Sequence, residues 1–407
     1  MNDPPRGGAS LEEKMNRWLV GMVLAVVLVG VGVGEARPRG GAGATVPPSA
    51  QGAVVAYVVM DAASGTVLME KEPHKRWPPA SMTKMMTVLL AMERVKSGAA
   101  KLDEPVHVSA WASRIGGSQV YLSAGESFTL AEMLKAVMIA SANDAAVAVA
   151  EHFGGSQPAF VELMNARAKE LGLADTTYQT PHGLPPGQGQ QPDISSAHDL
   201  AVLGRELMKY PEVMDWAKTP FAGFRNDTLQ MSNTNHLVRG TFPGATGLKT
   251  GFYQEAGFEV TATATRNDLD LIAVVLGVPS KQGSFTEAAR LLNEGFAVYK
   301  AVVASRRGTV VGDVPVSGGA EQSVKAVATD DLRLLVKRSE DHGVKVEARI
   351  PRLTTAPVRK DQPLGEIVVT RGTEEIGRVP VVAAADVPAA GWLAWIWNRG
   401  LTTASAR

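Results

Sequence analysis

Three short stretches of the chain carry side chains that could together perform acyl transfer. A serine hydroxyl attacks a carbonyl readily only when a base removes its proton, and a neutral lysine amine can be that base. Ser81 and Lys84 are three residues apart, so on a helix their side chains lie on one face, within reach of each other. This spacing predicts an activated serine nucleophile. The three stretches are Ser81-Met82-Thr83-Lys84, Ser141-Ala142-Asn143 and Lys249-Thr250-Gly251.

The position of Lys84 is unusual for a cation. Pro78 and Pro79 favour the start of a helix near Ser81, and residues 85–92 are apolar on nearly every face, which predicts a buried helix. Lys84 would then lie against the positive end of the helix dipole and beside a desolvating core. Both effects lower the pKa of an amine from its usual value of about 10.4, which is too high for a base at neutral pH. We therefore expect Lys84 to be functional.

The elements that must position these side chains are a loop between two helices and a group of strands. Thr129 and Glu132 have capping-box spacing, which predicts a helix from Thr129 to near Ala140. A second helix is expected after Asn143, so that residues 141–143 form a loop belonging to neither helix. Such a loop can direct both of its polar side chains the same way.

Strands are predicted at both ends of the catalytic region. Residues 53–70 form two β-rich runs joined by turn residues, which is typical of a hairpin. Residues 247–278 contain three strand-like runs, the middle one alternating apolar and polar side chains, and residues 285–302 have the periodicity of an amphipathic helix. We expect an α/β (α+β) fold whose antiparallel sheet joins both ends of residues 53–305.

Composition excludes several kinds of function. Lys and Arg equal Asp and Glu at 41 each among 407 residues, so no overall charge attracts nucleic acid. The absence of cysteine excludes thiol nucleophiles, disulfides and thiolate metal sites. The seven histidines show no short zinc-binding spacing.

The two ends of the chain carry targeting signals. Residues 1–36 resemble a secretory signal peptide, with an apolar run at 18–33 and a small residue after it, although an uncleaved anchor and a start at Met15 stay open. Residues 37–52 are expected to be a flexible linker. Residues 386–401 concentrate Trp392, Trp395 and Trp397, which favours the membrane interface over core packing. The sequence thus predicts export to the outer face of the cytoplasmic membrane, within the cell envelope.

Residues 308–384 are predicted to form a small, all-β, sandwich-like domain. They contain short alternating runs separated by Gly, Pro and Asp turns, without an obvious catalytic cluster. We interpret this domain as a spacer or a protein-contact module.

The three motifs indicate a class of enzyme only when they are taken together. Taken singly, they are most often a helix cap, a turn and a strand end. Their order and predicted settings resemble the serine enzymes that recognise penicillin. More closely, residues 53 to about 305 resemble the low-molecular-weight penicillin-binding proteins, the serine D-alanyl-D-alanine carboxypeptidases (peptidase S11-like). The matching blocks are "PPASMTKMMT", "GESFTLAEML", "SANDAAVAVAE", "FVELMNARAKELGL", "PHGLP", "SSAHDLA" and "GLKTG".

This resemblance implies a fold, a reaction and a role for each motif residue. The fold would be a β-lactamase/transpeptidase-like domain with a helical subdomain, and the reaction would remove terminal D-alanine from peptidoglycan stem peptides, with acylation by β-lactam antibiotics. Neither a metal nor an organic cofactor is implied. The implied catalytic residues are Ser81, Lys84 and Ser141, the substrate-binding residues are Asn143, Lys249, Thr250 and Gly251, and the oxyanion hole consists of the backbone N–H groups of Ser81 and Phe252.

Two alternatives stay open. A class A β-lactamase would need a glutamate that activates the deacylating water, and Glu162 lies in a stretch that is typical of plain helix. A catalytically silent, membrane-tethered wall-binding protein would keep the fold alone. Bulky Phe252 and Tyr253 after the third motif depart from the family pattern, and His182 is expected to be structural.

Overall fold

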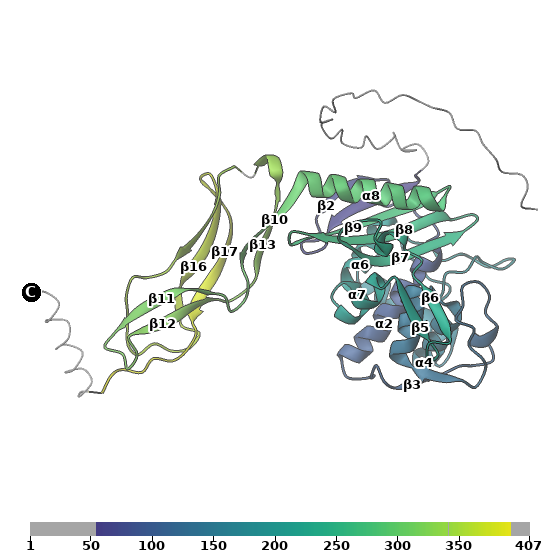
Figure 1. Ribbon diagram of the computed structural model, residues 1–407, viewed down its shortest axis with the longest axis horizontal. Coiled ribbons are helices and arrows are strands. Elements are labelled where there is room, and N and C mark those ends of the chain that lie inside the picture. Colours follow the sequence, from purple (N-terminus) through teal and green to yellow (C-terminus); the bar gives the residue numbers. More distant parts are fainter. Residues whose placement is uncertain (1–53, 341, 392–407) are drawn as a thin grey trace, which may run out of the picture. The chain divides into compact units, whose positions relative to one another are not determined.

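A computed structural model describes residues 54–340 and 342–391 of the chain (Figure 1). The predicted signal peptide, linker and three neighbouring tryptophans lie outside the described residues. Within the described residues, every helix is too short or too polar to cross a membrane.

A five-stranded antiparallel sheet with strand order β2-β1-β9-β8-β7 forms the centre of residues 54–298 (Figure 1). Strand β1 pairs along its whole length with β9, from Ala56 opposite Leu276 to Asp61 opposite Leu271. This pairing joins the N-terminal hairpin to the C-terminal strands and confirms the predicted sheet. The strands are β1 (Ala56–Asp61), β2 (Val67–Lys71), β7 (Ala245–Tyr253), β8 (Gly257–Arg266) and β9 (Leu269–Val278).

Helices cover both faces of this sheet. On β9, Ile272 and Val274 belong to the core shared with the helical region, whereas Ala273 and Val275 belong to the core beneath α8 (Lys281–Val298). Because both faces are buried, β9 is apolar at almost every position. The helical region consists of η1 (Ala80–Thr83), α2 (Lys84–Lys96), η2 (Ala112–Arg114), α3 (Leu130–Ile139), α4 (Asn143–Gly154), α5 (Gln157–Glu170), α6 (Ala197–Leu207), α7 (Pro211–Lys218) and η3 (His236–Arg239).

Two short strand pairs lie within the helical region. They are β3 (Pro105–His107) with β4 (Ser127–Thr129), and β5 (Phe221–Phe224) with β6 (Leu229–Ser232).

The helix boundaries follow their capping residues. Thr129 caps α3 with both hydrogen bonds of the capping box, as predicted. Asn143 is the first residue of α4 rather than part of the preceding loop, because its backbone already has helical geometry. The helix expected near Ser81 begins as the 3-10 turn η1, before α2 starts at Lys84. Helix α8 begins earlier than expected because Ser280 caps it, accepting a hydrogen bond from Gly283 N–H at 3.1 Å.

The all-β structure predicted for residues 308–384 is confirmed, but it already begins at Tyr299, because α8 ends at Val298 and residues 299–305 form strand β10 instead of continuing the predicted helix. A six-stranded sheet has the order β14-β16-β17-β12-β11-β15, and β10 pairs with β13. Val314, Ala326 and Val381 are fully buried in a separate core. The elements are β10 (Tyr299–Ser305), β11 (Val310–Ser317), β12 (Ser323–Ala328), β13 (Leu332–Lys337), η4 (Arg338–Glu340), β14 (Val344–Arg349), β15 (Thr354–Thr355), β16 (Pro363–Arg371) and β17 (Glu374–Ala383).

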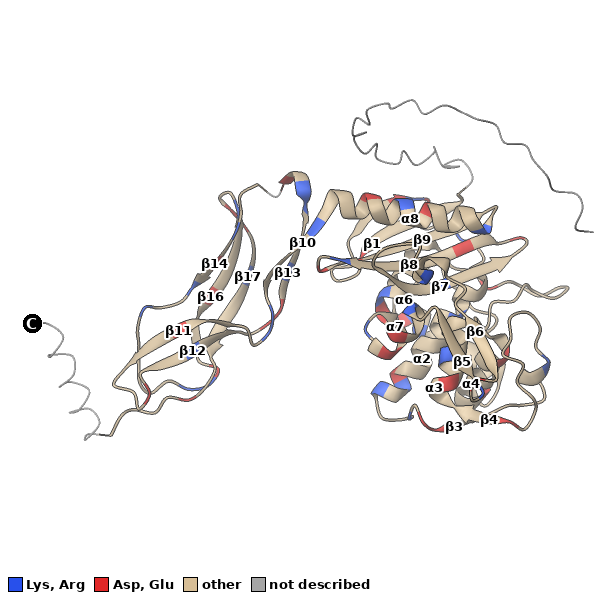
Figure 2. Ribbon diagram, viewed as in Figure 1, with Lys and Arg blue, Asp and Glu red and all other residues tan. Residues whose placement is uncertain are grey.

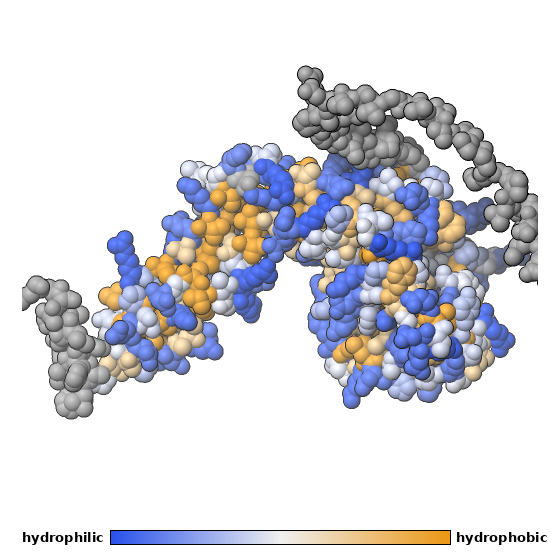
Figure 3. All heavy atoms as spheres, viewed as in Figure 1, coloured by the Kyte–Doolittle hydropathy of each residue, from blue (hydrophilic) through white to orange (hydrophobic). Residues whose placement is uncertain are grey.

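The described residues mix both signs of charge along the chain. Figure 2 shows basic and acidic residues interspersed over the strands and helices, in keeping with the equal totals of the sequence. Figure 3 shows apolar residues on the viewed face of the C-terminal strands, over β13, β16 and β17.

Candidate active site

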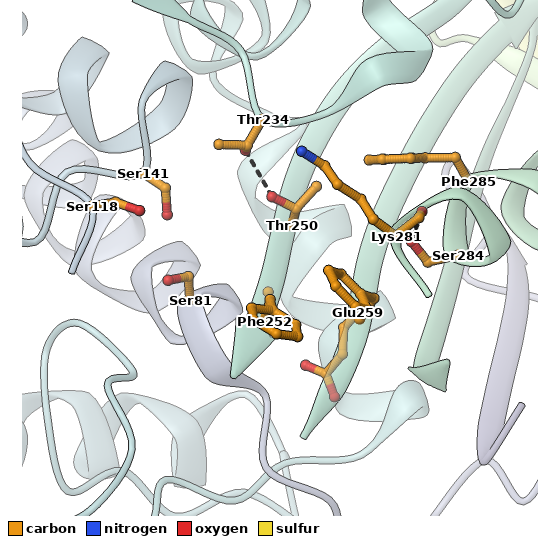
Figure 4. Close-up of a pocket in the computed structure, with 12 residues that line it drawn as sticks. Ser81, Ser118, Ser141, Thr234, Thr250, Phe252, Glu259, Lys281, Ser284 and Phe285 are labelled. Carbon is orange, nitrogen blue, oxygen red and sulfur yellow. Dashed lines mark hydrogen bonds between the residues drawn. The ribbon is translucent and has the colours of Figure 1, made fainter. Parts of the chain in front are cut away.

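A pocket of about 210 Å³ lies between strand β7 and the helical region, and it collects residues from all three motifs (Figure 4). The edge strand β7 brings the third motif to the start of η1, and the loop before α4 brings the second. The lining residues are Ser81, Ser118, Ser141, Thr234, Thr250, Gly251, Phe252, Phe258, Glu259, Lys281, Ser284 and Phe285.

The Ser81 hydroxyl and the Lys84 amine form the centre of the site. Lys84 Nζ lies 2.9 Å from Ser81 Oγ and donates a hydrogen bond to the carbonyl of His182 at 2.5 Å. The Lys84 side chain is fully buried. Burial, and then the charge of Lys249, hold the pKa of Lys84 well below its ordinary value, against the opposing charges of Asp193 and Asp144. A neutral Lys84 can accept the proton of Ser81.

The loop that carries His182 fixes the Lys84 amine. Gly183 has φ +74°, and a Cβ there would lie 1.9 Å from the carbonyl oxygen of Ala80, so only glycine permits this approach to η1. The ring of His182 accepts a hydrogen bond from Leu184 N–H at 3.1 Å. Burial and the nearby Lys84 lower the pKa of His182 to about 3. The imidazole is therefore neutral, and its role here is to shape the loop.

Ser141 and Lys249 form a second hydroxyl and amine pair. Lys249 Nζ donates to Ser141 Oγ at 2.8 Å and to the carbonyl of Thr250 at 3.0 Å. Burial lowers the pKa of Lys249 to about 7. Ser141 has φ +60°, a left-handed conformation that costs a non-glycine residue energy and is frequent at active sites. The pair can pass a proton towards an atom in the pocket.

Asn143, the first residue of α4, lies two residues after Ser141 but is buried and is not among the residues that line the pocket. Its Nδ2 donates to the carbonyl of Gly116 at 2.7 Å, and its backbone N–H donates to the carbonyl of Ser118 at 2.7 Å. Its Oδ1 is buried and accepts no hydrogen bond from any residue that the structure describes. A substrate amide N–H would satisfy this oxygen.

The third motif closes the opposite wall. Thr250 Oγ1 donates to Thr234 Oγ1 at 2.7 Å (Figure 4). A Cβ on Gly251 would lie 2.7 Å from the carbonyl oxygen of Pro79. The glycine therefore permits β7 to pack against the chain just before Ser81.

Ser81 and Phe252, whose N–H groups are predicted to form the oxyanion hole, both line the pocket. The Phe252 side chain is 54% exposed and stacks on Phe258, with ring centroids 4.0 Å apart. The bulky residue that departs from the family pattern thus contributes a half-exposed aromatic ring, stacked on Phe258, to the pocket lining.

Sequence reasoning missed five polar residues of the pocket: Ser118, Thr234, Glu259, Lys281 and Ser284. Glu259 is buried, and its carboxyl oxygens have no hydrogen-bond partner within the described part of the chain. Burial holds the pKa of Glu259 well above its ordinary value, and the nearby Trp77 indole lowers this pKa only in part. The Trp77 indole N–H donates its hydrogen bond to the carbonyl of Ala256. A glutamate within an otherwise apolar and threonine-rich strand was the one local signal.

Family models match most of the chain. Residues 44–280 match the model described as D-alanyl-D-alanine carboxypeptidase, and residues 299–389 match penicillin-binding protein 5, C-terminal domain. D-alanyl-D-alanine carboxypeptidase DacF of Bacillus subtilis is 36% identical over 348 residues, covering 83% of this chain and 87% of the relative. DacC of Escherichia coli is 33% identical, covering 84% and 86%.

Solved structures show the same similarity. Penicillin-binding protein 5 of Haemophilus influenzae aligns with a TM-score of 0.64 and 31% identity, over 85% of this chain and all of the other. Penicillin-binding protein D2 of Listeria monocytogenes, solved in an ampicillin-bound form, aligns with a TM-score of 0.55 and 28% identity, over 60% of this chain and 97% of the other.

Proposed function

The chain belongs to the D-alanyl-D-alanine carboxypeptidase family of serine peptidases, and we propose the residue roles by which it acts. The protein is a serine D-alanyl-D-alanine carboxypeptidase with an acyl-enzyme mechanism. Its proposed substrate is the pentapeptide stem of peptidoglycan, and β-lactam antibiotics are its proposed covalent inhibitors.

Acylation begins at Ser81. Neutral Lys84 takes the Ser81 proton as Oγ attacks the carbonyl carbon of the penultimate D-alanine. The oxyanion that forms accepts hydrogen bonds from the backbone N–H groups of Ser81 and Phe252. The carbon–nitrogen bond then breaks as Ser141, which accepts a hydrogen bond from Lys249, gives its hydroxyl proton to the leaving amine. The proton that Lys84 took from Ser81 replaces the one lost by Ser141, so Lys84 is neutral again before water attacks. D-Alanine departs and an ester to Ser81 remains.

Water completes the reaction by hydrolysing this ester. Lys84 Nζ, 2.9 Å from Ser81 Oγ, can take a proton from the attacking water and return it to Ser81 Oγ. Asn143 Oδ1, which has no partner among the described residues, would accept a hydrogen bond from the stem-peptide backbone. Lys249 and Thr250 face the terminal carboxylate in this proposal, beside Gly251, whose small size permits the close packing.

One observation carries these roles: a buried amine lies within hydrogen-bond distance of the serine hydroxyl it must activate. The test is labelling with a fluorescent penicillin, followed by measurement of D-alanine release from a synthetic peptide ending in D-Ala-D-Ala. We expect a covalent band and D-alanine release for the unaltered chain, and neither for Ser81→Ala.

The same experiment distinguishes the two alternatives. Rapid penicillin turnover without D-alanine release would favour a β-lactamase, although Glu162 is an exposed residue of α5 and does not line the pocket. The absence of labelling in a folded protein would favour a silent wall-binding protein.

We also propose that the protein is exported and acts at the outer face of the cytoplasmic membrane. The apolar run at 18–33 supports a signal peptide, and the three tryptophans near the C-terminus support contact with the membrane interface. Sequencing the N-terminus of the mature protein would identify the cleavage site expected after residue 36.

A further inference from the structure

A second pocket, of about 580 Å³, lies next to the loop that holds the Lys84 amine. It is lined by the two residues that flank η2, by the first residue of α5 and by residues between 179 and 191. His182 lines this pocket, and its carbonyl accepts the hydrogen bond from Lys84 Nζ at 2.5 Å. The second pocket therefore adjoins the catalytic centre, although none of the roles proposed above uses it.

One loop forms part of both pockets. Ile115 lines the second pocket, and Ser118 lines the catalytic pocket. Leu184, which also lines the second pocket, packs against this loop, since a Cβ on Gly117 would lie 3.0 Å from Leu184 Cδ2. The two pockets are therefore neighbours that meet at residues 115–118. A long substrate that acylates Ser81 can extend from one pocket to the other.

The second pocket offers no charge to a ligand. Among the described residues that line it, none is Asp, Glu, Lys or Arg. Its one titratable side chain, His182, is neutral because burial and the nearby Lys84 lower its pKa to about 3. An ionised group bound here would lose water without gaining a partner of opposite charge, which costs free energy. The pocket therefore suits a neutral ligand.

Side-chain amides supply most of its polar groups. The glutamines that line it are Gln157, Gln179, Gln190 and Gln191. Gln190 Oε1 accepts a hydrogen bond from Gly187 N–H at 2.9 Å, whereas the amides of the other three make no hydrogen bond within the part of the chain that the structure describes. Each amide has both donors and an acceptor. Such a set matches a ligand that carries several hydroxyl and amide groups.

Trp111 adds a flat apolar surface to the same pocket. Its side chain is 62% exposed and contacts no aromatic ring or cation among the described residues. Covering such a side chain is favourable, and the indole joins a large apolar area to one N–H donor. A pyranose sugar has C–H groups on its faces and hydroxyl groups around its edge. Its face can cover the indole while its hydroxyl groups bond to the glutamines.

We propose that the second pocket binds the glycan of peptidoglycan, the uncharged chain of N-acetylated sugars to which each stem peptide is attached. Trp111 and the free glutamine amides hold a sugar there while the stem peptide lies in the catalytic pocket. This inference rests on the proposed function, which supplies the substrate. The stem peptide itself is a poorer occupant, because its carboxylates would meet no cation among the lining residues.

The test compares a free pentapeptide ending in D-Ala-D-Ala with the same peptide attached to a disaccharide of N-acetylglucosamine and N-acetylmuramic acid. We expect the unaltered full chain to release D-alanine from the disaccharide peptide with the lower KM. Trp111→Ala should raise that KM by roughly three- to tenfold, the size of one aromatic contact, while kcat and the free pentapeptide are unaffected.

Two further variants are controls for this effect. Trp111→Phe keeps a flat ring and should retain most of the preference for the disaccharide peptide. Tyr121→Ala removes another exposed aromatic side chain, one that lines neither pocket, and should behave as the unaltered protein. Equal KM values for the two substrates in the unaltered protein would overturn the inference. Equal losses on both substrates in Trp111→Ala would also overturn it and would assign the pocket to the peptide.

A binding measurement separates this inference from the proposed function. Isothermal titration calorimetry of the full chain with tri-N-acetylchitotriose, an uncharged trimer of N-acetylglucosamine, should show binding that Trp111→Ala weakens and Tyr121→Ala does not. Equal affinity in Trp111→Ala and the unaltered protein would contradict a sugar site at this residue. Absence of D-alanine release from both peptides would instead overturn the proposed function, and trimer binding that depends on Trp111 would still support the glycan site.

Discussion

At the scale of single residues, the site depends on two buried amines, those of Lys84 and Lys249, whose pKa values are both lowered. Lys84 is lowered in pKa by burial and by Lys249, while Lys249 itself has a pKa of about 7. The charge of Lys249 is one of the causes that lower the pKa of Lys84, so a proton on Lys249 favours the free amine at Lys84 beside Ser81. The local position of Lys84 predicted this from the sequence, because a cation in the first turn of an apolar helix requires an explanation.

The lowered pKa of Lys249 makes a prediction for stability. Between about pH 7 and the unfolded value of about 10.4, the unfolded chain binds one more proton at this residue than the folded chain, so stability rises with pH. In Lys249→Met, the free energy of unfolding should rise by up to about 1.4 kcal/mol less per pH unit than in the unaltered protein. Thermal unfolding midpoints at pH 7, 8 and 9 would show a smaller rise than in the unaltered protein. The exposed control Lys169→Met should show the same rise as the unaltered protein. The same rise in Lys249→Met would contradict the prediction.

At the scale of elements, a loop and a strand converge on the 3-10 turn that carries Ser81. The loop at Gly183 approaches Ala80 from one side, and β7 at Gly251 approaches Pro79 from the other. Neither glycine can carry a side chain without moving η1. Gly183 and the motif residue Gly251 are therefore both required by close packing against the turn that carries the nucleophile.

Gly183→Ala should displace η1 and the Lys84 amine. We expect penicillin acylation to slow on the order of a hundredfold, the effect of a misplacement of about 1 Å. Gly189→Ala is a matched control, since Gly189 has φ +78° in the same loop but open space where a Cβ would lie. It should cost only the left-handed penalty of about 1–2 kcal/mol and leave the acylation rate unchanged. Similar acylation rates in the two variants would refute the steric account.

At the scale of the whole molecule, the catalytic region is closed by pairing the first strand with the last. Strand β1 pairs with β9, and this completes the sheet whose edge strand β7 carries Lys249 and Thr250. The all-β domain has its own core and follows α8 through β10. The residues that line the catalytic pocket therefore all come from one region of the chain, ahead of the all-β domain.

Removal of residues 392–407 should abolish membrane binding without affecting catalysis. A chain starting at residue 37 is expected to sediment with neutral phosphatidylcholine vesicles, with little gain from anionic lipid, since Lys and Arg are sparse near the tryptophans. The truncated chain should stay in the supernatant and release D-alanine at the same rate. A full-length variant with Trp392→Ala, Trp395→Ala and Trp397→Ala separates the role of the indoles from that of length. Unchanged sedimentation of the truncated chain would exclude this segment as the anchor.

The sequence by itself determined the features that depend on neighbours along the chain. Hydrophobic periodicity predicted the hairpin, the three later strands and α8, and the capping box at Thr129 predicted the start of α3. The three motifs, read together, indicated the serine and its base. These features are local, so helix caps, side-chain alternation and residue spacing are sufficient to specify them.

Only the tertiary structure decided which distant groups meet. The contact of Lys249 with Ser141, the carbonyl of His182 on Lys84, and the extension of Lys281 towards Thr234 all join segments far apart in the chain. Such contacts depend on strand register and on loops packed against η1, which no local pattern encodes. Lys281, an exposed lysine at the start of α8, lines the catalytic pocket only because the sheet places that helix beside it.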